Sequence, residues 1–202
     1  MIMTDGDDGY VMERNRLEAF SDGVLAIIIT IMVLELKQPL GDSLDDLLQM
    51  KDVFIVYLIS FLFIAIYWVN HHLVFHKVER VNVKILWCNI IWLLVMSLIP
   101  FATAWVDSYP TSYVPLCLYF TDMFLASVAF HVMYYLIVCE CGDRSCFRLD
   151  LRSIVSLITY GLAAVIGGLY PLISFIVVAA VSCWWIIPPK ENRSDRTQEA
   201  KG

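Results

Sequence analysis

Four polar side chains lie at the start of one apolar stretch: Arg16, Glu18, Ser21 and Asp22 in RLEAFSDGVLAIIIT, residues 16–30. In a membrane helix, a formal charge costs about 2.5–3.5 kcal/mol on the insertion scale and is normally paired or faces the bundle interior. Asp22 lies six residues past Arg16, which places it about 9 Å deeper along a helix. The sequence therefore predicts that groups on another helix bind Asp22.

Candidate partners occur at the same depth on the next two apolar stretches. They are Asn70, His71 and His72 at the end of one, and Asn82, Lys84 and Asn89 at the start of the other. We predict a polar belt that holds the first helix at a defined rotation. Its members are Arg16, Phe20, Ser21, Asp22, Asn70, His71, His72 and Asn89.

The histidines allow an alternative, in which they and Asp22 bind the metal of a membrane enzyme. His72 and His76 have the i, i+4 spacing that places two ligands on one helix face, whereas His71 and His72 point about 100° apart. A structural hydrogen bond for one residue of the pair, with the other facing the headgroups, is the simpler interpretation. We expect no metal, no cofactor and no catalytic residue.

Three cysteines also lie close together, Cys139, Cys141 and Cys146 in CECGDRSC. Their thiolates could bind a soft metal, but the paired C-x₂-C spacing of structural zinc sites is missing. Free thiols in a reducing cytosol are the simpler interpretation.

The composition is that of a membrane protein. Of 202 residues, 59% are hydrophobic and 17% are charged, and the mean hydropathy is +0.70. A soluble domain is about 25% charged and close to half apolar. We therefore expect the lipid bilayer as the surrounding partner and no nucleic acid, and the net charge of −6 says little about partners.

Six apolar runs are long enough to cross a hydrocarbon core of about 30 Å, which predicts an all-α polytopic fold. The predicted helices are 15–36, 53–75, 84–106, 112–138, 151–169 and 171–187. Gly167, Gly168 and Pro171 favour a tight hairpin between the last two, with one long broken helix as the alternative. The predicted organisation is a disordered acidic N-terminus (1–13), a transmembrane domain (14–187) and a disordered cytoplasmic tail (188–202).

The distribution of Lys and Arg predicts the orientation. With six spans, twelve basic residues lie on the side of both termini and only two, Lys37 and Lys51, on the other. Because cytoplasmic loops carry the excess of basic residues, both termini are predicted to be cytoplasmic.

Three motifs resemble one known family. RLEAFSDGVLAIIIT is similar to R-x-x-x-F-S-D-G-V-x-A-I, the signature of the family named after transmembrane protein 175, the lysosomal potassium channel. YWVNHHLVF resembles the end of that family's second span, and ERVNVKILWCNIIWLLVMSLIPFATAW resembles the junction and third span that follow. The agreement covers most of residues 14–106 and is loose afterwards.

The resemblance implies a potassium-permeable channel. Bacterial members carry one six-span unit, which implies a homotetramer whose first helices line a central pore. A single unit without an organelle signal further implies the plasma membrane of a prokaryotic cell, that is, the inner membrane.

The resemblance also implies which residues form the narrow part of the pore. The family uses bulky aliphatic side chains five, nine and twelve residues past the motif aspartate, which are here Ile27, Ile31 and Leu34. Thr30 matches a family threonine implicated in selectivity. No T-V-G-Y-G run occurs, so a filter of carbonyl rings is not expected, and a hydrophobic neck predicts modest selectivity. No Arg-rich span of the voltage-sensor kind occurs, so we expect a leak-like channel.

Other interpretations remain open at this point. An aliphatic stripe at helical spacing is more often packing than a pore. A proton-permeable channel or transporter could use Asp22 with His71 and His72, and the metal-dependent enzyme described above is the third class.

Overall fold

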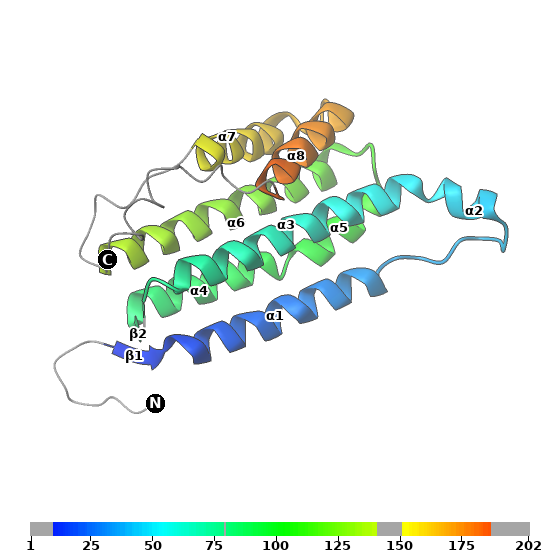
Figure 1. Cartoon of the computed structure of the whole chain (residues 1–202). Coiled ribbons are helices and arrows are strands. Elements are labelled where there is room, and N and C mark those ends of the chain that lie inside the picture. Colours follow the sequence, from blue (N-terminus) through cyan, green and yellow to red (C-terminus); the bar gives the residue numbers. More distant parts are fainter. Residues whose placement is uncertain (1–9, 79, 141–150, 187–202) are drawn as a thin grey trace, which may run out of the picture.

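The computed structural model describes residues 10–78, 80–140 and 151–186, which form a helical bundle with a small sheet at one end (Figure 1). The helix axes run in nearly the same direction. The elements in chain order are β1 (Tyr10–Glu13), α1 (Arg14–Leu34), α2 (Leu44–Gln49), α3 (Lys51–Phe75), β2 (Arg80–Asn82), α4 (Val83–Met96), α5 (Ile99–Ser108), α6 (Tyr113–Glu140), α7 (Leu151–Ile166) and α8 (Pro171–Ile186).

Four segments of the described chain are long and apolar enough to cross a membrane. They are α1, α3, the combined α4–α5 segment Val83–Ser108, and α6. The helices α7 and α8 occupy the positions of the fifth and sixth predicted spans, but each has only 16 residues. That length corresponds to about 24 Å of helix, against a hydrocarbon core of about 30 Å.

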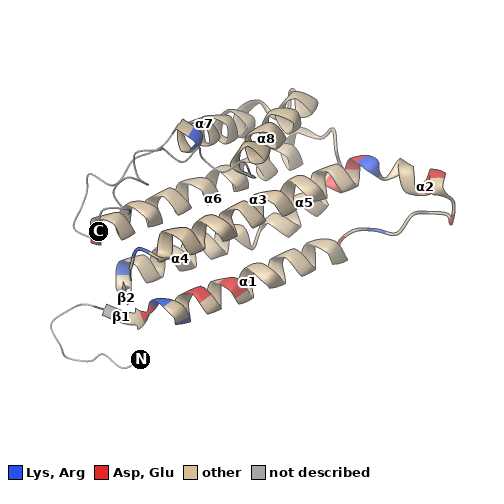
Figure 2. Ribbon diagram, in the orientation of Figure 1, with Lys and Arg blue, Asp and Glu red and all other residues tan. Residues whose placement is uncertain are grey.

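The charged residues gather at the two ends of the bundle (Figure 2). One end carries β1, β2 and the start of α1, and the opposite end carries α2 and the start of α3. Between these ends the ribbons carry few charges, among them Asp22 of α1 and the buried Asp122 of α6. This distribution is what a protein with a lipid-embedded middle requires, since a charge at the bilayer centre is costly.

The third predicted span is not one continuous helix. It ends at Met96 and restarts at Ile99, with Pro100 in the first turn of α5. Proline has no N–H to bond the carbonyl of Met96, four residues earlier, and its ring would clash with that carbonyl. The predicted span over 84–106 is thus present as the combined segment Val83–Ser108, with a break before Pro100 that the prediction did not include.

The predicted disorder of residues 1–13 is wrong for its last part. Tyr10–Glu13 form β1, which pairs with β2 in an antiparallel register that places Glu13 opposite Arg80. Val81 of β2 is fully buried, so the ribbon is fixed to the bundle by packing as well as by backbone bonds. The predictions for residues 1–9 and 188–202, and for Cys141 and Cys146, fall outside the described residues.

The predicted hairpin between the last two helices is confirmed. The helix α7 ends at Ile166 and α8 begins at Pro171. A Cβ atom on Gly167 would lie 2.3 Å from the carbonyl oxygen of Ala163 and 2.4 Å from the ring of Phe120. The turn therefore needs glycine because there is no room for a side chain.

Candidate functional site

A chain of buried hydrogen bonds joins α1, α4 and α3. The Ser21 hydroxyl donates to the carbonyl of Leu17, 2.9 Å away, and accepts from Asn89 Nδ2 at 3.0 Å. Asn89 Oδ1 lies 2.9 Å from Nε2 of His71. Because Asn89 Oδ1 can only accept, the proton of His71 is on Nε2.

Burial makes these bonds obligatory. Ser21 and Asn89 are 0% exposed and His71 is 1% exposed, and a buried polar group without a partner is costly. The His71 ring also stacks on Trp92, with centroids 5.1 Å apart and planes 14° apart. The polar contact is therefore held in place by aromatic packing on α4.

Asp22 and Glu18 find partners on α3, as the depth argument requires. Asp22 Oδ1 accepts a hydrogen bond of 2.8 Å from the indole N–H of Trp68. Glu18 lies 3.2 Å from Arg14 Nε on its own helix and 3.3 Å from Nδ1 of His72. Glu18 and Asp22, one helical turn apart on α1, thus each contact a different residue of α3.

The structure does not bring all members of the predicted belt together. Asn70 donates to the carbonyl of Ile66 on its own helix and lines a cavity that contains no residue of α1. Arg16 and Phe20 lie on the exposed side of α1. Only Ser21, Asp22, His71, His72 and Asn89 make the contacts between helices described above.

Sequence reasoning missed Trp68 and Trp92. Trp68 binds the motif aspartate and Trp92 supports His71, and neither residue is a member of the predicted belt. The available signal was spacing, because Trp68 precedes His71 and His72 by three and four residues and therefore shares their helix face.

The two sides of α1 differ sharply in burial. Leu17, Ser21, Leu25, Ile28 and Met32 are buried against the rest of the chain. A second stripe, about 110° around the helix, is open to the surroundings: Phe20 is 55%, Ile27 60%, Ile31 43% and Leu34 80% exposed. Ile27, Ile31 and Leu34 fall within about 60° of one another around the helix axis.

The open stripe borders a groove of about 480 Å³ between α1 and α5. Its wall on α1 consists of Val24, Ile27, Ile28 and Ile31, with Glu35 just past the helix end. Thr30 is exposed next to this wall, and its hydroxyl donates to the carbonyl of Ile27 at 2.8 Å. The stripe residues thus share one uncovered surface that the chain itself does not fill.

No group of three or more His, Cys, Asp or Glu side chains in the described ranges is arranged to hold a metal ion. His72 and His76 lie close together, with their Nε2 atoms 3.0 Å apart, but they do not belong to such a group. The four membrane-length segments define a multi-pass helical membrane protein. Its first helix is bound to the neighbouring helices on one face and is exposed on another.

Comparison with known proteins identifies the family. Residues 16–100 match the family described as endosomal/lysosomal potassium channel TMEM175. A potassium channel of Chryseobacterium sp. (strain P1-3) is 40% identical over 184 residues, covering 89% of this chain and 95% of the relative. The chain therefore belongs to the TMEM175 family, which consists of ion channels, and the prediction that it is not an enzyme is confirmed on that ground.

A solved structure and a vertebrate relative extend the comparison. The crystal structure of a lysosomal potassium-selective channel TMEM175 homolog from Chamaesiphon minutus matches with a TM-score of 0.75 and 25% identity, covering 86% of this chain and 96% of that one. The endosomal/lysosomal proton channel TMEM175 of Gallus gallus is 30% identical over 103 residues, covering 48% of this chain and 20% of the relative.

Proposed function

We propose that this protein is a potassium-permeable channel in which four copies of the chain surround a pore lined by α1. The observation that carries the proposal is the uncovered aliphatic stripe of α1, which lies about 110° around the helix from the face that packs against α3, α4 and α5. A helix face that stays open within one subunit needs lipid, a second subunit or a pore beside it. The potassium-channel relatives favour the pore.

The constriction in this proposal consists of rings of Ile27, Ile31 and Leu34. The helix α1 is continuous from Arg14 to Leu34, so its carbonyls in this region are bonded within the helix and cannot replace an ion's hydration shell. A hydrophobic neck gates by dewetting. The channel should therefore conduct a partly hydrated ion, with modest selectivity and a leak-like dependence on voltage.

The proposed topology has six spans, with both termini in the cytoplasm of a prokaryotic cell. Arg14, Arg80, Lys84 and Arg152 lie at the end of the bundle that carries β1 and β2, which the positive-inside rule assigns to the cytoplasm. In this topology α7 and α8 are shorter than the hydrocarbon core is thick. Short spans are accommodated by local thinning of the bilayer or by flanking polar side chains that extend to the membrane surface.

Reconstitution into liposomes with a potassium gradient tests the pore. The variants Ile27→Asn, Ile31→Asn and Leu34→Asn each place an amide on the stripe, and at least one should change the potassium flux or the ratio of potassium to sodium permeability. The matched control is Val33→Asn, because Val33 is 46% exposed but lies about 120° around the helix from Ile27. Wild-type permeation in all three stripe variants would overturn the proposal.

A proton-permeable channel is the second candidate, and the structure changes which residues it would use. Glu18 Oε1 lies 3.3 Å from Nδ1 of His72, whose Nε2 is 3.0 Å from Nε2 of His76. This row of titratable groups at the end of the bundle with β1 and β2 could pass protons, and the Gallus gallus relative is named as a proton channel. Asp22 instead pairs with Trp68.

The reversal potential in planar bilayers separates the two candidates. A potassium channel follows the potassium gradient and ignores a pH gradient, whereas a proton channel does the opposite. If His72→Ala abolishes a pH-driven current and leaves a potassium-driven current intact, both ions pass and the histidine row serves only protons.

A further inference from the structure

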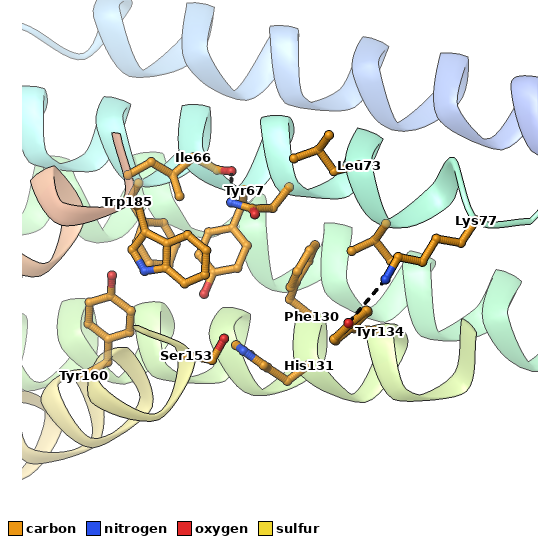
Figure 3. Close-up of a pocket in the computed structure, with 13 residues that line it drawn as sticks. Ile66, Tyr67, Leu73, Lys77, Phe130, His131, Tyr134, Ser153, Tyr160 and Trp185 are labelled. Atoms are coloured by element: carbon orange, nitrogen blue, oxygen red, sulfur yellow. Dashed lines mark hydrogen bonds between the residues drawn. The ribbon is translucent and has the colours of Figure 1, made fainter. Parts of the chain in front are cut away.

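A second cavity lies on the side of α3 that faces away from α1 (Figure 3). It has a volume of about 290 Å³ and is bounded by α3, α6, α7 and α8. This volume is at the lower end of small-molecule sites. The cavity has no residue of α1 in its lining, so its role is separate from the proposed pore.

The cavity lining changes character along α3. Phe63, Ile66 and Tyr67 lie at its deep end, and Asn70, Leu73 and Lys77 follow toward the end of the helix. From Phe63 to Phe75, the last residue of α3, the helix rises about 18 Å, and Lys77 follows two residues later. The apolar part therefore lies toward the bundle middle and the cation lies at the end where basic residues gather.

Two polar side chains are placed along the wall by contacts of their own. The Lys77 ammonium lies 3.3 Å from the Tyr134 hydroxyl and 4.9 Å from the centre of that ring. Asn70 uses one N–H for the carbonyl of Ile66, and its side chain reaches the cavity. Lys77 is thus held beside the cavity by an aromatic ring.

The described lining residues include one lysine, Lys77, at the end of the cavity near β1 and β2. The 13 lining residues include Lys77 and His131, and none of these 13 is Asp or Glu. Ser153 and the hydroxyl-bearing Tyr160 add further polar groups, while Phe130 and Trp185 supply apolar surface. Leu73 is 58% exposed beside the cavity, which leaves that part of the wall open to the bilayer.

We propose that this cavity binds an anionic phospholipid from the leaflet next to β1 and β2, which is the cytoplasmic leaflet in the proposed topology. The phosphate lies near Lys77 and an acyl segment lies along Leu73 toward Phe63. This direction matches a lipid in that leaflet, whose headgroup is at the surface and whose chains point to the bilayer centre. Basic pockets between membrane helices on the cytoplasmic side suit anionic headgroups.

Trp185 provides a local reporter, because it lines the cavity. The full-length protein is reconstituted in phosphatidylcholine vesicles containing a small fraction of phosphatidylglycerol brominated on an acyl chain, which quenches nearby tryptophan fluorescence. The same measurement on Trp185→Phe isolates the Trp185 signal. We expect saturable quenching by brominated phosphatidylglycerol and much weaker quenching by brominated phosphatidylcholine.

Lys77→Gln should weaken the apparent affinity for phosphatidylglycerol about fivefold, the effect of one basic residue near an anionic surface. Lys84→Gln is the matched control, because Lys84 is an exposed cation at the same end of the bundle but does not line the cavity. Lys77 is exposed near the end of α3, so its replacement should leave folding intact, which size-exclusion chromatography checks.

Three results would overturn the inference. The first is equal quenching by the two brominated lipids. The second is an equal loss of affinity for phosphatidylglycerol in the Lys77 and Lys84 variants, which would indicate only a general attraction to the anionic surface. The third is quenching of Trp185 by brominated fatty acid with none by the phospholipid, which would assign the cavity to a free carboxylate. A failure of the pore variants would leave this test unaffected, since it measures lipid contact and not ion flux.

Discussion

The hydrogen bond between Ser21 and Asn89 fixes α1 to α4, and its strength can be calculated and measured. Inter-helix hydrogen bonds in membranes contribute about 0.6 kcal/mol on average and at most about 1.7 kcal/mol. Asn89 makes two, to Ser21 at 3.0 Å and to His71 at 2.9 Å. Asn89→Ala should therefore lower the free energy of unfolding by about 1–3 kcal/mol, and Ser21→Ala should lower it by less.

A double-mutant cycle isolates the bond itself. The free energy of unfolding is measured for the wild type, Ser21→Ala, Asn89→Ala and the double variant, by titrating detergent micelles with sodium dodecyl sulfate. The protein concentration is held constant, because assembly into oligomers changes apparent stability. We expect a coupling energy of about 0.6 kcal/mol, since the cycle cancels the cavity that each alanine leaves.

Ser97→Ala supplies the matched control for the cycle. The Ser97 hydroxyl donates to the carbonyl of Leu94 on its own segment, and eight residues separate it from Asn89, about 12 Å along a helix. Substitutions that far apart add within about 0.5 kcal/mol. If the Ser21 cycle gives a coupling no larger than the Ser97 cycle, the Ser21–Asn89 contact does not stabilise the position of α1 and the reasoning is refuted.

Two further predictions concern the packing behind α3. Gly167→Ala should destabilise the protein by about 1–3 kcal/mol and so lower its unfolding temperature, because the added Cβ would overlap Phe120. Gly23→Ala is the control and should not lower the unfolding temperature, because its Cβ would meet nothing within 4 Å. Equal unfolding temperatures for the two variants would contradict this prediction. Tyr119→Phe should cost about 0.5–1.5 kcal/mol, because it removes a hydroxyl 2.9 Å from the buried Ser60 Oγ. In a Ser60→Ala background that loss should shrink, and an unchanged loss in unfolding measurements would show that the bond is not its cause.

The sequence predicted the elements better than their contacts. Apolar length alone located every membrane-length helix of the described chain, because that signal is a sum over some twenty residues. It did not predict which of the polar residues near the end of α3 meets the neighbouring helices, since Asn70, His71 and His72 are consecutive and point to different sides of the helix. Asn70 and His71 are neighbours in sequence but point about 100° apart, so only His71 reaches Asn89.

Two local features were readable and were given too little weight. Pro100 marks the break between α4 and α5, since proline belongs in the first turn of a helix and not in its interior. The run Tyr10–Met12 has strand-forming residues, but the acidic residues before it favoured disorder. The pairing of β1 with β2 depends on residues about 70 positions apart, which no local pattern contains.

The anchored and open faces of α1 are connected by geometry. Ser21 lies about 120° around the helix from Ile27, so the bond to Asn89 sets where the stripe of Ile27, Ile31 and Leu34 points. A rotation of α1 by one residue, about 100°, would break that bond and turn the stripe toward the neighbouring helices. In the proposed pore, these buried polar contacts would affect permeation without touching an ion. By fixing the rotation of α1, they would determine which side chains form the narrowest ring.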